Sequence, residues 1–357
     1  MTRPQRVQSA TELAEVSLLF VIFKFYSRAG VFFFFFFKFS VMLILLLILA
    51  TYQILAQIKK PFTVYWNVPT HQCTSKKIPF GNLYEKFGIT QNTNDNFLGD
   101  KIAILYLDRD LFPMLSMNKS GQINGSKNGG VPQLGDLTSH LQEFASVVDK
   151  FIPDPNFNGV GVLDFEKWRP IFRQNFRSGP LAVYQNRSID IPREFRDKQI
   201  RSAARVRFEE SARRFMQTTL SLAKEMRPKA LWGYYAYPYC FNEITEQCSK
   251  LVLEENDHWL WAESTAVFPS VYTSTVLPPA QLAARIRGRV MEALRVSRNQ
   301  TPVLPYFSFD DLNTALKTLY NSNASGFVIW GASENVNTVE KCKKLYEYVE
   351  QVLGKRT

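Results

Sequence analysis

Short apolar runs alternate with longer stretches of helical periodicity along almost the whole chain after residue 60. The apolar runs are bounded by Gly, Pro or Asp, and each has the length of a buried strand. The predicted strands are residues 62–66, 102–106, 159–164, 231–235, 259–263, 303–306 and 326–330. One continuous strand–helix series of this kind predicts a parallel sheet that is covered by helices.

The helical stretches space their apolar side chains at three and four residues, most clearly at 200–226, whose other face is rich in Arg and Glu. Further helices are predicted at residues 137–151, 279–296, 309–320 and 339–353, and a surface loop at 118–135. About seven strands in one series favour an α/β barrel of the TIM type. A doubly wound open sheet is the alternative, but no Gly-x-Gly-x-x-Gly or Walker loop follows the first predicted strand.

Two acidic residues, Asp164 and Glu166, mark the end of the predicted strand 159–164. Their spacing of two puts both carboxyl groups on one face of an extended chain. Active sites of α/β barrels lie at the C-terminal ends of the strands. Neighbouring carboxyl groups disfavour double ionisation, so one keeps its proton, and the pair predicts acid catalysis of glycoside cleavage. The alternative is that the two acids form ion pairs with Lys167 and Arg169.

Aromatic residues stand at the ends of other predicted strands: Tyr106, several within 232–239, Tyr272 and Trp330. Rings stack on the C–H faces of sugars, and phenolic hydroxyls donate hydrogen bonds. Aromatic residues at the mouth of a barrel therefore favour a carbohydrate site. For any one of them, a place in the hydrophobic core is the alternative.

The chain has 4 cysteines and none forms a Cys-x-x-Cys pair, which fits two disulfides better than a metal site. Cys240 and Cys248 are close enough in sequence to close one loop, whereas Cys73 and Cys342 lie at opposite ends of the predicted barrel. This spacing predicts the pairs Cys240–Cys248 and Cys73–Cys342, and disulfides are typical of proteins outside the cytosol.

Residues 1–60 are predicted to be a signal peptide or a signal anchor that precedes a single catalytic domain, residues 61–357. Residues 41–50 have the length of a signal-peptide apolar region, and the longer run 31–50 is nearly long enough to span a bilayer. Secretion is therefore predicted, with membrane anchoring as the alternative. Asn-x-Ser/Thr glycosylation sequons agree with export and begin at Asn118, Asn124, Asn186, Asn299 and Asn323.

The net charge of +11 favours an anionic partner. Lys and Arg are spread along the chain without any nucleic-acid-binding motif, so nucleic acid is not a predicted partner. The 3 histidines, His71, His140 and His258, stand far apart and form no Glu-x-x-His motif. Neither a metal site nor a Ser-His-Asp triad is predicted, and no cofactor is expected.

The segment 161–175, Gly-Val-Leu-Asp-Phe-Glu-Lys-Trp-Arg-Pro-Ile-Phe-Arg-Gln-Asn, closely resembles the catalytic stretch of the animal hyaluronidases, glycoside hydrolase family 56, above all the insect venom-type enzymes. Further segments that resemble this family are residues 62–70, 128–133, 232–240 and 326–330. The resemblance covers almost everything from Pro61 to the C-terminus.

The resemblance implies a distorted barrel and an endo-acting enzyme that hydrolyses β-1,4 bonds between N-acetylglucosamine and glucuronate in hyaluronan. Chondroitin is expected as a second substrate, and the protein is expected to be a monomer. The resemblance also implies Glu166 as the acid and then the base of a retaining reaction whose nucleophile is the acetamido oxygen of the substrate. Asp164 would hold the acetamido N–H and Tyr235 would hydrogen-bond the acetamido group. Tyr106, Tyr272 and Trp330 would line sugar subsites, and the two disulfide pairings agree.

One segment departs from the family pattern. After residues 303–306 the family carries a longer aromatic and charged loop, whereas here Phe307 and Ser308 lead directly into the next predicted helix. Loops after strands form the active-site rim, so the change bears on substrate binding. The alternative function is a secreted hyaluronan-binding protein or venom allergen without turnover, and the intact Asp164 and Glu166 favour the enzyme.

Overall fold

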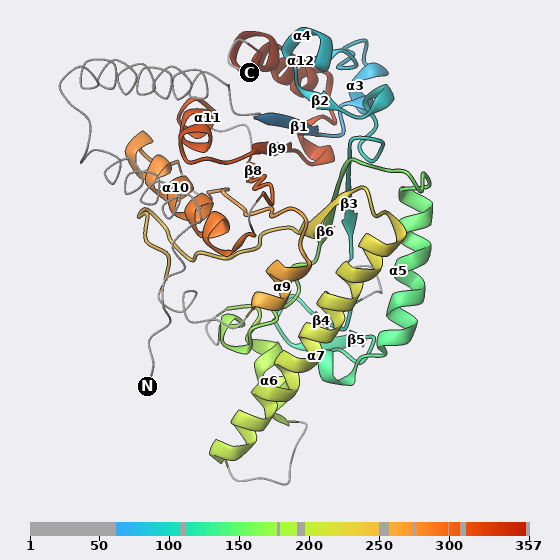
Figure 1. Ribbon diagram of the computed structural model, residues 1–357, viewed down its shortest axis with the longest axis vertical. Helices are drawn as coiled ribbons and strands as arrows, with labels where there is room; N and C mark the ends of the chain where they lie inside the picture. Colours follow the sequence, from blue (N-terminus) through green and yellow to red (C-terminus); the bar gives the residue numbers. More distant parts are fainter. Residues whose placement is uncertain are drawn as a thin grey trace, which may run out of the picture. The chain divides into compact units, whose positions relative to one another are not determined.

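The computed structural model describes residues 62–107, 112–176, 179–190, 197–249, 257–273, 276–298, 300–307 and 312–354, which belong to one compact unit, Pro61–Thr357 (Figure 1). In these ranges, no helix has both the length and the apolar character that crossing a membrane requires. The signal peptide or anchor expected in residues 1–60 lies outside the described residues and stays a prediction.

Strands and helices alternate along the chain, as predicted. The strands are β1 (Thr63–Asn67), β2 (Thr90–Gln91), β3 (Ile102–Tyr106), β4 (Met114–Met117), β5 (Ile123–Lys127), β6 (Val160–Asp164), β7 (Leu231–Tyr234), β8 (Tyr306–Phe307) and β9 (Gly326–Trp330). The α-helices are α3 (His71–Thr74), α4 (Leu83–Phe87), α5 (Leu137–Phe151), α6 (Ala182–Asp190), α7 (Asp197–Met226), α9 (His258–Glu263), α10 (Pro279–Val296), α11 (Leu312–Asn321) and α12 (Val339–Tyr348). Short 3-10 turns are η1 (Thr93–Asp95), η2 (Pro132–Leu134), η3 (Phe172–Gln174) and η4 (Ser333–Asn335), and a π-helical turn, η5 (Val349–Leu353), follows α12.

The parallel strands form two sheets with the orders β2-β1-β9-β8 and β3-β6-β7. The extended segment 266–271 joins β7 to β8 and so connects the two sheets. It does so through the parallel bridges Tyr235–Phe268, Val267–Val303 and Ser270–Tyr306. The strands therefore follow one another around a distorted α/β barrel, the fold class that the alternation predicted.

Alternate side chains of these strands point to opposite faces, which gives the barrel an inner and an outer core. The inner cluster consists of Ile102, Ile104, Val160, Val162, Ala266, Phe268, Leu304, Tyr306 and Val328. The intervening residues, such as Leu105 and Leu163, pack outward in a second cluster that includes Phe144 of α5 and Phe208 of α7. Helices α5 and α7 lie side by side against the β3-β6-β7 sheet (Figure 1). A third cluster fills the space between β1, β9 and the helices α10, α11 and α12.

One buried side chain, Asn92, spans the gap between β2 and β3. Its Oδ1 accepts hydrogen bonds from the backbone N–H groups of Lys101 and Ile102 at 2.8 and 2.9 Å, and its Nδ2 donates to the carbonyl of Ile102 at 2.9 Å. A single amide thus replaces a ladder of backbone hydrogen bonds, and it ties the first sheet to the second.

Two sequence-based expectations are corrected. Residues 259–263, predicted as a strand, lie in helix α9, and the strand position falls at 266–271 instead. A short apolar run does not distinguish a strand from a buried helical turn; Trp259, Leu260 and Trp261 are all buried in the outer core. The predicted loop 118–135 also contains β5, which pairs antiparallel with β4.

Two disulfides cross-link the unit. Cys73 of α3 is bonded to Cys342 of α12, and Cys240 is bonded to Cys248. These are the pairs expected from the spacing and the family resemblance. The first bond connects residues that are 269 positions apart in sequence, whereas the second closes a loop of 8.

Candidate active site

The acidic pair continues the inward-facing row of β6. Val160 and Val162 belong to the inner core, and Asp164, two residues on, is the last residue of the strand. Phe165 points the other way, where its ring stacks on Phe112 with centroids 4.2 Å apart. The outward anchoring of Phe165 explains why Asp164 and Glu166 come to one side, above the barrel interior.

A cavity of about 220 Å³ lies at this end of the barrel and is called here the carboxylate cavity. Its lining residues are Ile104, Asp164, Glu166, Tyr235, Tyr272, Tyr306 and Trp330. Both predicted catalytic carboxyl groups and three predicted aromatic side chains, those of Tyr235, Tyr272 and Trp330, therefore lie in one site.

Tyr106 lies next to this cavity and contacts one of its lining residues. In the parallel pairing of β3 with β6 it stands opposite Asp164. Its hydroxyl accepts a hydrogen bond from Nε1 of Trp330 at 3.0 Å, and Trp330 meets Tyr272 edge to face at 6.5 Å. Side chains that are separated by 224 residues in sequence thus meet on one wall of the site.

Tyr235 directly follows β7, and its backbone N–H donates to the carbonyl of Leu163 at 3.0 Å. Its hydroxyl donates to Oγ of Ser270 at 3.4 Å, and the backbone carbonyl of Ser270 accepts a hydrogen bond from the guanidinium of Arg289. Burial, reinforced by the nearby carboxyl groups of Glu166 and Asp164, raises the pKa of Tyr235 well above its ordinary value of 10.0. Tyr235 is therefore a neutral hydrogen-bonding group at any physiological pH.

The tyrosines at 272 and 306 present buried hydroxyl groups for which the described residues provide no hydrogen-bond partner. Burial is the main cause that raises the pKa of both phenols. An unsatisfied buried hydroxyl is costly in a folded protein. Placed at the carboxylate cavity, such groups suit a ligand rich in hydroxyl and amide groups.

Tyr306 is not among the site residues that the sequence predicted. The signal is the same alternation that places Asp164: Leu304 and Tyr306 are consecutive inward positions at a strand end, as are Ile104 and Tyr106. Ser270 is missed for a related reason, because the strand that carries it was expected at 259–263.

The aromatic side chains of residues 232–239 lie partly in the site and partly in the hydrophobic core. Tyr235 lines the carboxylate cavity, but Trp232, Tyr234 and Tyr237 belong to the outer core. The hydroxyl of Tyr234 donates to the carbonyl of Met216 at 3.0 Å. For most of this run, the core interpretation is correct.

Arg169, one of the two proposed ion-pair partners of the acids, makes contacts with the segments that follow β6 and β7. Its Nη1 donates to the carbonyl of Gln174 at 2.7 Å. Its guanidinium lies over the ring of Tyr239 at 4.4 Å and over that of Phe241 at 5.1 Å. Arg169 thus stabilises the segment that leaves β6.

Within the described ranges, no group of three or more His, Cys, Asp and Glu side chains has a geometry that would hold a metal ion. His140 is buried, and its Nε2 lies 2.7 Å from Oγ1 of Thr219 in the packing of α5 against α7. The titratable groups that line the carboxylate cavity are the carboxyl groups of Asp164 and Glu166 and the phenols of three tyrosines. A carboxyl pair above the interior of a parallel barrel, surrounded by aromatic side chains, is an arrangement typical of glycoside hydrolases.

Comparison with known proteins gives the family. The hyaluronidase family model, glycoside hydrolase family 56, matches residues 53–356. Hyaluronidase from Apis mellifera is 42% identical over 321 residues, 83% of each chain, and Hyaluronidase A from Vespula vulgaris is 43% identical over 321 residues, 83% of this chain and 96% of that one. The crystal structure of bee venom hyaluronidase in complex with a hyaluronic acid tetramer has a TM-score of 0.77 and 41% identity, and covers 83% of this chain and 98% of the bee chain. The chain belongs to the hyaluronidase family.

Proposed function

We propose that this protein is an endo-acting hyaluronidase that hydrolyses β-1,4 bonds between N-acetylglucosamine and glucuronate in hyaluronan, with Glu166 as its acid and base. The observation that carries the proposal is the carboxylate cavity, where Asp164 and Glu166 lie among tyrosine and tryptophan side chains. The hyaluronic acid tetramer bound to the bee venom enzyme supports the choice of substrate.

In the proposed reaction the carboxyl group of Glu166 donates its proton to the glycosidic oxygen as the bond to C1 breaks. The acetamido oxygen of the same sugar attacks C1 from the opposite face and forms a cyclic oxazolinium intermediate. The Glu166 carboxylate then takes a proton from water as the water oxygen attacks C1 and opens the ring. Two inversions give retention at C1, and the enzyme returns to its starting protonation state.

Asp164 and Tyr235 take supporting roles in this proposal. The Asp164 carboxylate accepts the acetamido N–H and stabilises the positive charge that develops on the oxazolinium ring. Tyr235, kept neutral by its raised pKa, turns its hydroxyl hydrogen away from Oγ of Ser270 and donates it to the acetamido group. Tyr106, Tyr272 and Trp330 provide surfaces for the neighbouring sugars.

The test measures hyaluronan chain length over time with the disulfide-bonded protein and two variants. Glu166→Gln keeps the shape but removes the transferable proton, so we expect cleavage to fall at least about 1000-fold while polymer binding persists. Asp164→Asn removes charge that matters most in the transition state, so kcat should fall strongly with little change in affinity. Binding without any turnover by the unaltered, folded protein would overturn the enzyme assignment. Substantial cleavage by Glu166→Gln would overturn only the role of that residue.

Chondroitin is the second substrate that this mechanism allows, because its N-acetylgalactosamine carries the same acetamido nucleophile. We also propose that the protein acts as a monomer outside the cytosol. The two disulfides support export. So does the exposure of the sequon residues Asn118, Asn124, Asn186 and Asn323, whereas Asn299 lies outside the described residues.

A further inference from the structure

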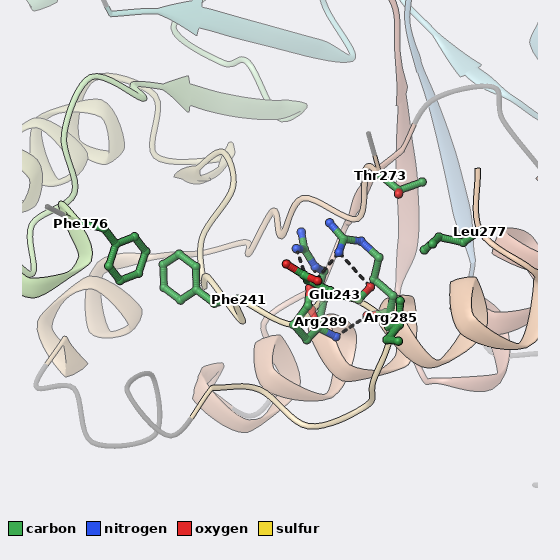
Figure 2. Close-up of a pocket in the computed structure, with 9 residues that line it drawn as sticks. Phe176, Phe241, Glu243, Thr273, Leu277, Arg285 and Arg289 are labelled. Atoms are coloured by element: carbon green, nitrogen blue, oxygen red, sulfur yellow. Dashed lines mark hydrogen bonds between the residues drawn. The ribbon is translucent and has the colours of Figure 1, made fainter. Parts of the chain in front are cut away.

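A second, larger pocket lies beside the carboxylate cavity and is called here the arginine pocket. Its volume is about 520 Å³. Figure 2 shows Phe176 and Phe241 at one end, Thr273 and Leu277 at the other, and Arg285 and Arg289 between them. The pocket thus combines aromatic rings, a hydroxyl and two cationic groups, and none of its residues takes part in the proposed bond cleavage.

The two arginines stand one turn apart on α10 and reach the loops that follow two barrel strands. Arg285 donates to the carbonyl of Tyr272 at 2.8 Å and to that of Asn242 at 2.8 Å. Arg289 donates to Oδ1 of Asn242 at 3.0 Å and to the carbonyl of Ser270. These acceptors are neutral oxygens, so they orient the guanidinium groups without neutralising their charge.

The arginine pocket shares its wall with the carboxylate cavity. Tyr272 presents its ring to the cavity, while its backbone carbonyl accepts from Arg285 and the next residue, Thr273, lines the pocket. Ser270 also connects the two sites. Its Oγ accepts a hydrogen bond from the hydroxyl of Tyr235, and its backbone carbonyl accepts one from the guanidinium of Arg289. A polymer that leaves the cavity past Tyr272 therefore meets the two arginines.

The electrostatics of the pocket favour an anion. Burial, followed by the positive charge of Arg285, lowers the pKa of Arg289 to about 10, which still leaves it protonated at neutral pH. An anion placed between the two guanidinium groups would relieve this repulsion. The exposed carboxylate of Glu243, which also lines the pocket, opposes anion binding. It attracts Arg285 and repels an incoming anion.

The aromatic end of the pocket suits the apolar face of a sugar ring. Phe176 and Phe241 meet edge to face with centroids 5.2 Å apart, and Phe241 stacks on Tyr239 at 5.3 Å. Both phenylalanines line the pocket, and the C–H face of a saccharide can pack against such rings.

We propose that the arginine pocket is a saccharide subsite that binds a uronate unit of the polymer through Arg285 and Arg289, next to the sugars held in the carboxylate cavity. This proposal rests on the proposed function, because it assumes that the ligand is a uronate-containing polymer. It gives the pocket a specificity role: the enzyme recognises the repeating negative charge of its substrate as well as the acetamido sugar.

The test combines a change in the protein with a matched change in the ligand. Two ligands are compared: hyaluronan oligosaccharides, and carboxyl-reduced oligosaccharides in which each uronate has become a neutral glucose. The affinity of each ligand is measured for two proteins, Glu166→Gln and the double variant Glu166→Gln/Arg285→Gln. A charge-assisted hydrogen bond that is lost corresponds to an affinity change of about tenfold or more. We therefore expect Arg285→Gln to lower the affinity for native hyaluronan oligosaccharides about tenfold, and the affinity for the neutral oligosaccharides less than about twofold. Equal weakening of both ligands would overturn the proposal, because it would mean that Arg285 only holds the loops.

Arg287→Gln is the matched control. Arg287 is on the same helix, but it is exposed and pairs with Glu246 at 2.5 Å, away from the pocket lining, so the binding of neither ligand should change.

A second variant, Glu243→Gln, keeps the proposal testable if Arg285→Gln does not fold. It removes a charge that repels the anion and retains the backbone carbonyl that accepts a hydrogen bond from Arg285. We expect it to strengthen native hyaluronan binding and leave the neutral ligand unchanged. No change with either ligand would overturn the proposal. Turnover of native hyaluronan by the unaltered protein is measured separately, so a failure of the proposed function is not confused with a failure of the subsite.

Discussion

A strand residue reaches the carboxylate cavity only when its side chain points to the inner face of the barrel. Ile104 and Tyr106 on β3, Val162 and Asp164 on β6, and Leu304 and Tyr306 at β8 are consecutive inward positions, apolar below and polar at the rim. The acid pair was predictable because its spacing of two shows this alternation directly. Tyr306 was not singled out, because a tyrosine at the end of a short apolar run is also a common core residue.

The first residue-scale prediction concerns Tyr306. Tyr306→Phe removes a buried hydroxyl that has no hydrogen-bond partner among the described residues and keeps the ring that meets Tyr235 at 5.1 Å. We expect kcat/KM for hyaluronan to fall about tenfold, the effect of losing one substrate hydrogen bond, with no loss of unfolding free energy.

Tyr234→Phe is the control for this substitution. It deletes the hydroxyl that donates to the carbonyl of Met216, so stability should drop by about 1 kcal/mol while activity is kept. The assignment of Tyr306 to the site fails if its variant loses stability instead of activity. Steady-state kinetics and urea unfolding of both variants distinguish these outcomes.

The second residue-scale prediction concerns the pH dependence of stability. Asp95 is 4% exposed and accepts from Oγ1 of Thr70 at 2.7 Å, and burial raises its pKa from 3.8 to about 6. The folded protein therefore binds this proton more tightly than the unfolded chain does. The resulting stabilisation is fully present below about pH 4 and is lost as the pH rises through 6.

Asp95→Asn removes this proton linkage. Between pH 5 and pH 7.5 the unaltered protein should lose about 1 kcal/mol of unfolding free energy that the variant does not lose. Urea unfolding of both proteins at the two pH values measures the difference. If both proteins change equally over this interval, the carboxyl group of Asp95 does not titrate there.

At the scale of elements, periodicity predicted most of the barrel but misplaced one strand. Helices α5 and α10 begin and end where the three- and four-residue spacing predicted, and β3 and β9 coincide with their apolar runs. The segment 266–271 was missed because it forms only single bridges to its neighbours and contains a proline at 269. Its place in the sheet depends on the flanking strands, which is information that a local pattern does not carry.

The prediction at this scale concerns the junction of β2 with β3. Asn92→Ala leaves the backbone N–H groups of Lys101 and Ile102 without their acceptor inside the protein. Because unsatisfied buried donors are costly, we expect a loss of about 3 kcal/mol of unfolding free energy. Asn96→Ala, at a nearby exposed position, should change it by less than about 0.5 kcal/mol. Similar denaturation midpoints for the two variants would show that Asn92 does not hold the two strands together.

At the scale of the whole described unit, the Cys73–Cys342 bond joins the beginning and the end of the barrel. Cross-links that close long loops restrict the unfolded chain most. Both pairings were predictable from spacing and family resemblance, whereas the arginine pocket was not. That pocket depends on how α10 reaches the loops at Asn242 and Tyr272, which no sequence spacing reveals.

The prediction at this scale compares the two disulfides. Replacing both Cys73 and Cys342 with Ala should lower the unfolding free energy by about 5 kcal/mol, and replacing Cys240 and Cys248 should lower it by about 2.5 kcal/mol, following the loop-length dependence of chain entropy. Guanidinium unfolding of the two double variants gives the comparison. An equal or larger loss from the short loop would contradict it.

Trp330 also gives the molecule an optical property. Of the 6 tryptophans, Trp66, Trp168, Trp232, Trp259 and Trp261 are buried at 9% exposure or less. Trp330 lines the carboxylate cavity and donates its indole N–H to Tyr106. If a saccharide occupies the cavity as proposed, we expect it to change the polarity around this indole more than around the five buried ones, so that the emission follows occupancy. Unlabelled protein therefore carries its own fluorescent probe, one that works even in variants that no longer cut the polymer.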